Sequence, residues 1–207
     1  MTQFYTLTMI ISITSFALAS TMTPGPNNIM LLSSGLTFGY KRTIPHALGI
    51  NFGFPVMVLC VGLGVGKLFE VFPFIYTILK VIGISYLLWM AWHIANTKGA
   101  PDTENKNDKP FTFFQAALFQ WINPKAWVMA VTATTAFITN HQIALIQVII
   151  IAGIYFFCAI LSTNSWALGG VMLKRFIQNE RLVQIFNITM AILIVGSTLP
   201  FVLELNL

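Results

Sequence analysis

Two short stretches of the sequence combine helix-breaking prolines with polar side chains that could hold a small ligand. The candidate residues are Pro24, Gly25, Pro26, Asn27 and Asn28 in the first stretch and Asn123, Pro124 and Lys125 in the second. Proline lacks a backbone N–H and clashes with the preceding helical turn, which frees carbonyl oxygens and exposes a new helix N-terminus. That N-terminus favours anionic groups. A zwitterion could therefore place its carboxylate there and its ammonium group on the freed carbonyls.

The two breaks occupy matching positions, since Pro24 and Pro124 lie 100 residues apart, each within a long stretch that is almost free of charge. A single proline could simply kink a membrane helix for packing, because proline is not rare there. Two breaks, each beside asparagine, favour a binding site, because secondary transporters build substrate sites from broken helices.

Lys125 and Asn164 are polar residues for which both a functional and a structural role can be argued. A charge inside a membrane is costly and usually functional, so Lys125 is predicted to hold a substrate carboxylate or to act as a counter-charge. The alternative is a lysine whose flexible stem reaches the membrane surface. Asn164 is a weaker candidate for the site, because such a residue more often ties one helix to its neighbour.

The composition indicates an integral membrane protein. Of the 207 residues, 57% are hydrophobic and only 8% are charged, whereas soluble domains carry about 25% charged residues. An ordinary soluble enzyme, a nucleic-acid-binding protein and a disordered chain are thereby excluded. Cys60 and Cys158 lie far apart and the three histidines are scattered, so no disulfide, metal site or cofactor is expected.

The uncharged stretches predict an all-α fold with six transmembrane helices, because a bilayer core needs roughly 20 apolar residues of helix. The predicted spans are Tyr5 to Tyr40 (interrupted), Ile44 to Gly66, Phe74 to Asn96, Phe111 to Thr139, Ile143 to Gly170, and Leu182 to Leu203. Residues 1–207 then form one transmembrane domain. Its halves, 5–96 and 111–204, would be two inverted three-helix repeats with broken helices one and four, joined by the hydrophilic linker 97–110.

The positions of lysine and arginine predict the orientation. Eight of the eleven follow spans one, three and five, and only Lys67 lies on the opposite side. Both termini are therefore expected outside the cytoplasm, and the net charge of +5 requires no nucleic-acid partner. Glycines spaced four apart, Gly49 with Gly53 and Gly35 with Gly39, permit close helix approach, either within the chain or in a homodimer.

Three motifs resemble those of the LysE/RhtB amino-acid exporters. Residues 23–28, Thr-Pro-Gly-Pro-Asn-Asn, look like the N-terminal signature of that family, residues 83–89 are similar to its third-span pattern, and residues 123–125 match its Asn-Pro-Lys motif. The resemblance covers essentially the whole chain. It implies a multi-pass protein of the bacterial inner membrane that exports an amino acid or derivative, driven by the proton gradient, without enzymatic activity.

Within this family, the doubled asparagine and Asn164 near Trp166 are most similar to the cysteine/O-acetylserine exporter branch. Export of homoserine, threonine, leucine or lysine stays open. Many relatives carry an acidic residue in the fifth span, whereas residues 156–160 here have none. This difference argues against a cationic substrate and leaves the proton carrier unassigned.

Two other functional classes are disfavoured. An intramembrane enzyme would need a nucleophile with a base, or a metal cluster, at one depth, and no such motif is present in the sequence. A simple channel does not require asparagine-bearing helix breaks.

Overall fold

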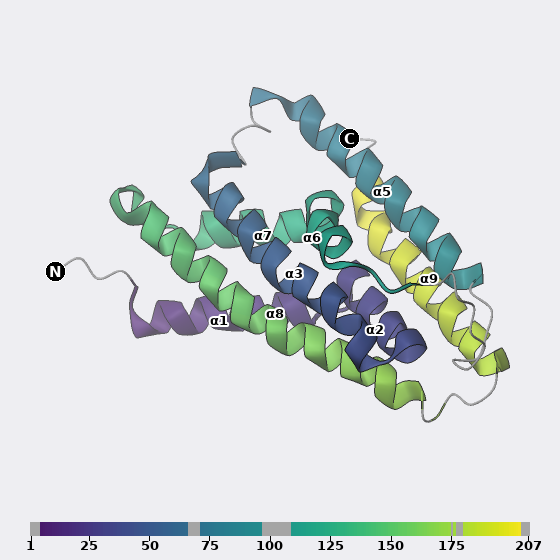
Figure 1. Ribbon diagram of the computed structural model, residues 1–207. Coiled ribbons are helices and arrows are strands. Elements are labelled where there is room, and N and C mark those ends of the chain that lie inside the picture. The colour runs from purple at the N-terminus through teal and green to yellow at the C-terminus, as the bar shows by residue number, and fades with distance from the viewer. Residues whose placement is uncertain (1–4, 66–70, 97–108, 175, 177–179, 204–207) are drawn as a thin grey trace.

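The structure, a computed structural model, describes residues 5–65, 71–96, 109–174, 176 and 180–203. Within these ranges every regular element is helical, as predicted (Figure 1). The α-helices are α1 (Leu7–Met22), α2 (Pro26–Phe38), α3 (Tyr40–Cys60), α5 (Pro73–Asn96), α6 (Phe113–Ile122), α7 (Pro124–Phe137), α8 (Ala144–Lys174) and α9 (Glu180–Leu203), and two short segments are η1 (Val61–Val65) and η2 (His141–Ile143). The linker predicted at 97–110 lies outside the described residues except for 109 and 110.

Three of the described helices are long and apolar enough to cross a membrane, namely Tyr40–Val65, Thr77–Asn96 and Ala144–Lys174. The pair α1 and α2 adds a fourth span if it is counted as one bent element. Of the six predicted spans, up to four thus have membrane-spanning helices, and the complete six-span arrangement stays a prediction.

The break in the first span lies where the proline-rich motif predicted it. Helix α1 ends at Met22, and α2 starts with Pro26 at its first position after Gly25. The two helices meet at an angle of 56°. Proline fits the first turn of a helix because its missing N–H would have no partner there, so this sequence both ends α1 and begins α2.

The fourth predicted span is broken in the same manner. Helix α6 begins with a capping box between Thr112 and Gln115 and ends at Ile122. Asn123 then caps α7 by accepting a hydrogen bond from the backbone N–H of Lys125, and Pro124 is the first residue of that helix. Both predicted breaks are therefore present.

The turn from α2 into α3 depends on Gly39, whose φ of 76° lies in the left-handed region that favours glycine. Helix α3 consequently begins at Tyr40, earlier than the predicted start at Ile44. Gly39 is therefore a turn residue, and its predicted role in helix packing is wrong, because nothing lies within 4 Å of where its side chain would be.

Glycine elsewhere allows helices to touch along their backbones. A side chain added at Gly35 of α2 would meet the backbone of Ala167 in α8, and one at Gly53 of α3 would meet Ala117 in α6. A side chain at Gly49 would also meet α6. These close approaches lie within the chain, so the homodimer predicted through the glycine faces stays a prediction that this packing does not support.

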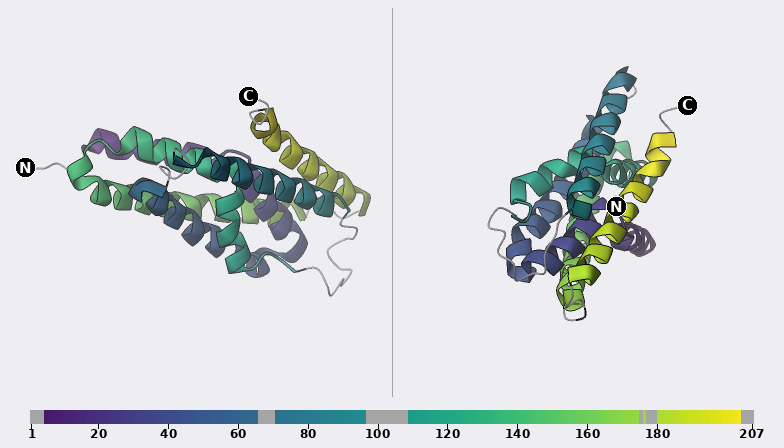
Figure 2. Two further views of the ribbon diagram at one scale, coloured as in Figure 1. Left: turned by 90° about the horizontal axis from the view of Figure 1, so that it is seen from above. Right: turned by 90° about the vertical axis from the view of Figure 1, so that its right-hand side faces the viewer.

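Helix α8 lies along α1, α2 and α3, while α5 and α9 pair beside this group (Figures 1 and 2). The interior contains Tyr155, Met57 and Ile151, all 0% exposed. Large apolar side chains also cover the outside, such as Phe157 (72% exposed) and Phe114 (73% exposed). Apolar residues on several outward faces are expected where lipid, rather than water, surrounds the protein.

Candidate functional site

The two helix breaks meet in the folded chain, and Lys125 joins them. Its Nζ donates a hydrogen bond of 2.6 Å to the carbonyl of Thr23 and lies 3.4 Å from the carbonyl of Pro24. Both carbonyls belong to the break between α1 and α2, where the helical bonding ladder is interrupted. A cation from one break thus occupies the backbone acceptors of the other.

Gly25 makes room for this contact. A β-carbon at position 25 would lie 2.7 Å from Cδ and 3.0 Å from Nζ of Lys125. The backbone at Gly25 is extended, with φ of −177°, so glycine is needed here for space rather than for its conformation. The small residue between the two prolines therefore lets the lysine reach the carbonyls.

A pair of amides forms a second link between the breaks. Asn27 Nδ2 donates to Gln120 Oε1 at 2.8 Å, and Gln120 Nε2 donates back to Asn27 Oδ1 at 3.2 Å. Gln120 is 0% exposed and also donates to the carbonyl of Ala116. The pair fixes the start of α2 against the end of α6.

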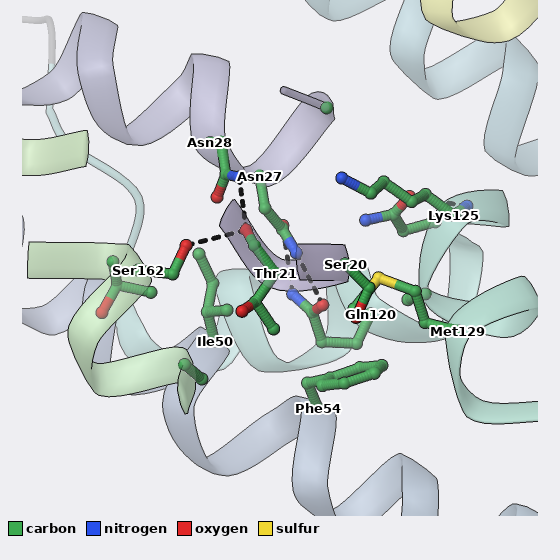
Figure 3. Close-up of a pocket in the computed structure, with 15 residues that line it drawn as sticks. Ser20, Thr21, Asn27, Asn28, Ile50, Phe54, Gln120, Lys125, Met129 and Ser162 are labelled. Atoms are coloured by element: carbon green, nitrogen blue, oxygen red, sulfur yellow. Dashed lines mark hydrogen bonds between the residues drawn. The ribbon is translucent and has the colours of Figure 1, made fainter. Parts of the chain in front are cut away.

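Asn28 satisfies the carbonyls at the end of α1. Its Nδ2 donates to the carbonyls of Thr21 at 2.7 Å and Thr23 at 2.9 Å. Ser162 of α8 also donates to the carbonyl of Thr21, at 2.8 Å (Figure 3). Side chains thus replace the intrahelical donors that the break removes.

These residues surround a small cavity at the centre of the fold, with a volume of about 40 Å³ (Figure 3). Helices α1, α2, α3, α6, α7 and α8 all contribute to its wall. We call it the central cavity. Since one water needs roughly 10–15 Å³ of such space, the central cavity has room for about three waters. A bound amino acid would have to displace the Lys125 side chain or widen the walls.

The central cavity is positive in character. Lys125 is the one charged residue among its described lining residues, and no carboxylate is found there. The N-terminus of α2 also has no side-chain cap, whereas Asn123 caps that of α7. The uncapped N-terminus adds partial positive charge beside the lysine. Groups that bind an anion and backbone carbonyls that bind a cation therefore lie side by side.

The structure brings most of the predicted site residues together. Those that line the central cavity are Gly25, Asn27, Asn28, Asn123 and Lys125. Pro24, Pro26 and Pro124 shape the breaks instead of lining the cavity. Asn164 lies apart from it, because its side chain bonds Tyr40 and the carbonyl of Ile160. Asn164 therefore connects α8 to α3, which is the alternative role considered for it in the sequence.

Sequence reasoning missed Gln120, Thr21 and Ser162. Gln120 is a polar residue three positions before Asn123, so its place near a break in an apolar span was an available signal. Ser162 and Thr21 gave no such signal, because serine and threonine are common in membrane helices and bond their own backbone.

In the described part of the chain, no cluster of three metal-ligating side chains occurs.

Fold and site together define a class: a helical membrane protein whose polar site lies where two broken helices meet, as in secondary transporters. The chain belongs to the LysE type translocator family, whose model matches residues 18–205. It is therefore a transporter and a multi-pass membrane protein, not an enzyme, in agreement with the prediction.

Two proteins with similar sequences share one name. A cysteine/O-acetylserine efflux protein of Salmonella choleraesuis (strain SC-B67) is 33% identical over 185 residues, 87% of this chain and 91% of that protein. Its namesake in Escherichia coli O1:K1 / APEC is 30% identical over 191 residues, 92% of this chain and 95% of that protein. No solved structure matches the chain.

Proposed function

We propose that this protein exports small neutral amino acids or their derivatives, of the cysteine and O-acetylserine kind, from the cytoplasm. The observation that carries the proposal is the contact between Lys125 and the carbonyls of Thr23 and Pro24. It places an ammonium group on acceptors that could equally hold the ammonium of an amino acid. The ammonium of Lys125 therefore occupies the position that we propose for the ammonium of the substrate.

Binding would be an exchange of partners. The α-ammonium of the substrate takes the carbonyls of Thr23 and Pro24, and the released Nζ of Lys125 pairs with the substrate carboxylate. The uncapped N-terminus of α2 supports the same carboxylate. Every charge of the zwitterion then has a partner, as burial in a membrane protein requires.

The absence of a carboxylate among the described lining residues of the central cavity supports a neutral side chain on the substrate. A lysine side chain would bring a second cation next to Lys125 without a counter-charge. The names of the similar efflux proteins point to cysteine and O-acetylserine. Homoserine, threonine and leucine fit the same charge requirements and are the alternative substrates.

We further propose six spans arranged as two inverted repeats, 5–96 and 111–204, in a bacterial inner membrane. The pairing of broken helices α1/α2 and α6/α7, and the packing of α3 on α8 and of α5 on α9, support this arrangement. The lysine and arginine bias supports both termini on the extracytoplasmic side. Export against a gradient needs an energy source, which we propose to be the proton gradient.

The test is an export assay on cells that overexpress the chain and are loaded with a mixture of amino acids. Appearance of each amino acid in the medium is followed by mass spectrometry, with and without a protonophore. We expect one or two neutral amino acids to be enriched, and the enrichment to be lost with the protonophore. A correctly inserted protein that enriches none of them would contradict the proposed function.

A further inference from the structure

A second cavity, of about 250 Å³, lies between α2, α3, α5, α6 and α9 and shares no lining residue with the central cavity. It sits at the end of α2 marked by Phe38 and next to Lys109, which precedes α6. This end of the bundle carries Lys41 and Arg42 as well. By the charge bias it is the cytoplasmic end.

His46 of α3 borders the second cavity and is only 1% exposed. Among the described residues neither of its ring nitrogens has a hydrogen-bond partner, and its ring packs against Phe111 at 5.2 Å between centroids. The hydroxyls of Ser34 and Thr43 nearby on α2 and α3 bond to each other instead. A buried polar group normally finds a partner, and His46 borders the second cavity without one among the described residues.

The wall of the second cavity defines the chemistry of that ligand. Lys109 supplies a positive charge, and the described lining residues include no carboxylate. Ser33, Thr37 and Gln115 add hydroxyl and amide groups. A small molecule with a carboxylate and hydrogen-bonding groups fits this wall, and the larger volume leaves space for water around it.

Helices α2, α3 and α6 each contribute residues to both cavities. Helix α2 contributes Asn27 to the central cavity and Met30 to the second, one helical turn further on. Met30 and Phe119 belong to a single apolar cluster, 4% and 2% exposed. Met30 lines the second cavity, and Phe119 precedes Gln120 of the central cavity in the chain, so this cluster lies beside both cavities.

We propose that the second cavity is a cytoplasmic-side binding site for the exported amino acid, which is held by Lys109 and His46 before it reaches the central cavity. The proposal rests on the proposed function. It assigns the carboxylate to Lys109 and gives the His46 ring the hydrogen-bond partner that it lacks.

The first test measures uptake of radiolabelled O-acetylserine into inside-out vesicles, where the cytoplasmic face is outside. The variants are Lys109→Gln and His46→Phe, which keeps the ring packing but cannot hydrogen-bond. We expect KM to rise at least about tenfold with the maximal rate nearly unchanged. Lys41→Gln is the matched control, because it removes an exposed cation at the same end of the bundle, and its KM is expected to stay within about twofold.

A wild-type KM in both variants would overturn the second site while leaving the proposed function intact. Absence of uptake by the wild-type protein, by contrast, would overturn the proposed function for this substrate. A fall in maximal rate at unchanged KM would also contradict binding at this site.

The second test detects occupancy directly. Ser33→Cys is made in a chain whose native cysteines, Cys60 and Cys158, are replaced by alanine, and it is labelled with a membrane-impermeant maleimide from the cytoplasmic face. We expect labelling that saturating O-acetylserine slows severalfold. A labelling rate that O-acetylserine does not change, or the absence of labelling from this face, would overturn the inference.

Discussion

Replacing Lys125 by methionine tests the contact on which the proposed site depends. The change removes the ammonium group but keeps an unbranched side chain of similar length. The carbonyl of Thr23 also accepts a hydrogen bond from Asn28, so it keeps a partner once the lysine is gone. We therefore expect Lys125→Met to reach the membrane in normal amounts and to fail in transport.

The size of the effect follows from the geometry. A hydrogen bond to a charged group contributes about 1.5–3 kcal/mol, and the 2.6 Å contact to Thr23 shows that Nζ reaches into the break. If the same group pairs with the substrate carboxylate, its loss lowers transport efficiency by roughly 10- to 150-fold, since about 1.4 kcal/mol corresponds to a factor of ten.

The assay compares initial efflux rates from cells or vesicles at equal amounts of inserted protein. Lys41→Met is the matched control, because Lys41 is exposed and does not line the central cavity. Transport by Lys125→Met within about twofold of the wild type would refute the reasoning. Equal losses in both variants would point to a general charge effect instead.

Three further changes test the wall of the central cavity and its surroundings. Gly25→Ala should fold, because only the flexible end of Lys125 must move, yet lower transport at least about tenfold by displacing that end; efflux rates at matched protein amounts will show whether it does. Gln120→Leu leaves the amide of Asn27 without its partner and should lower the free energy of unfolding by about 1–3 kcal/mol, measurable by thermal denaturation in detergent. Asn164→Leu should keep transport within about twofold, because it changes a contact outside the cavity, and a severe loss would show that this residue belongs to the site.

Local features of the sequence determined the helical membrane character and the position of both breaks. Charge is scarce enough that only a lipid environment suits the chain. The prolines that stand beside glycine or asparagine, at residues 24–28 and 123–125, interrupt a helix, whereas Pro55 lies inside α3. Neither effect depends on distant residues. For this reason Pro24 and Pro124 correctly predicted where α1 and α6 end. The start of α3 was predicted too late, because Gly39 turns the chain directly from α2 into α3 without a loop.

Only the tertiary structure decided which atoms meet. The prediction that Lys125 takes part in a site did not reveal that it bonds carbonyls at the other break, because that contact joins segments about 100 residues apart. The sequence also did not predict that Gln120 bonds Asn27, that Gly53 packs on Ala117 of α6, or that the ring of His46 is buried without a partner. Each depends on how apolar helices pack, and in a chain that is apolar on nearly every face the hydrophobic pattern does not say which face meets which.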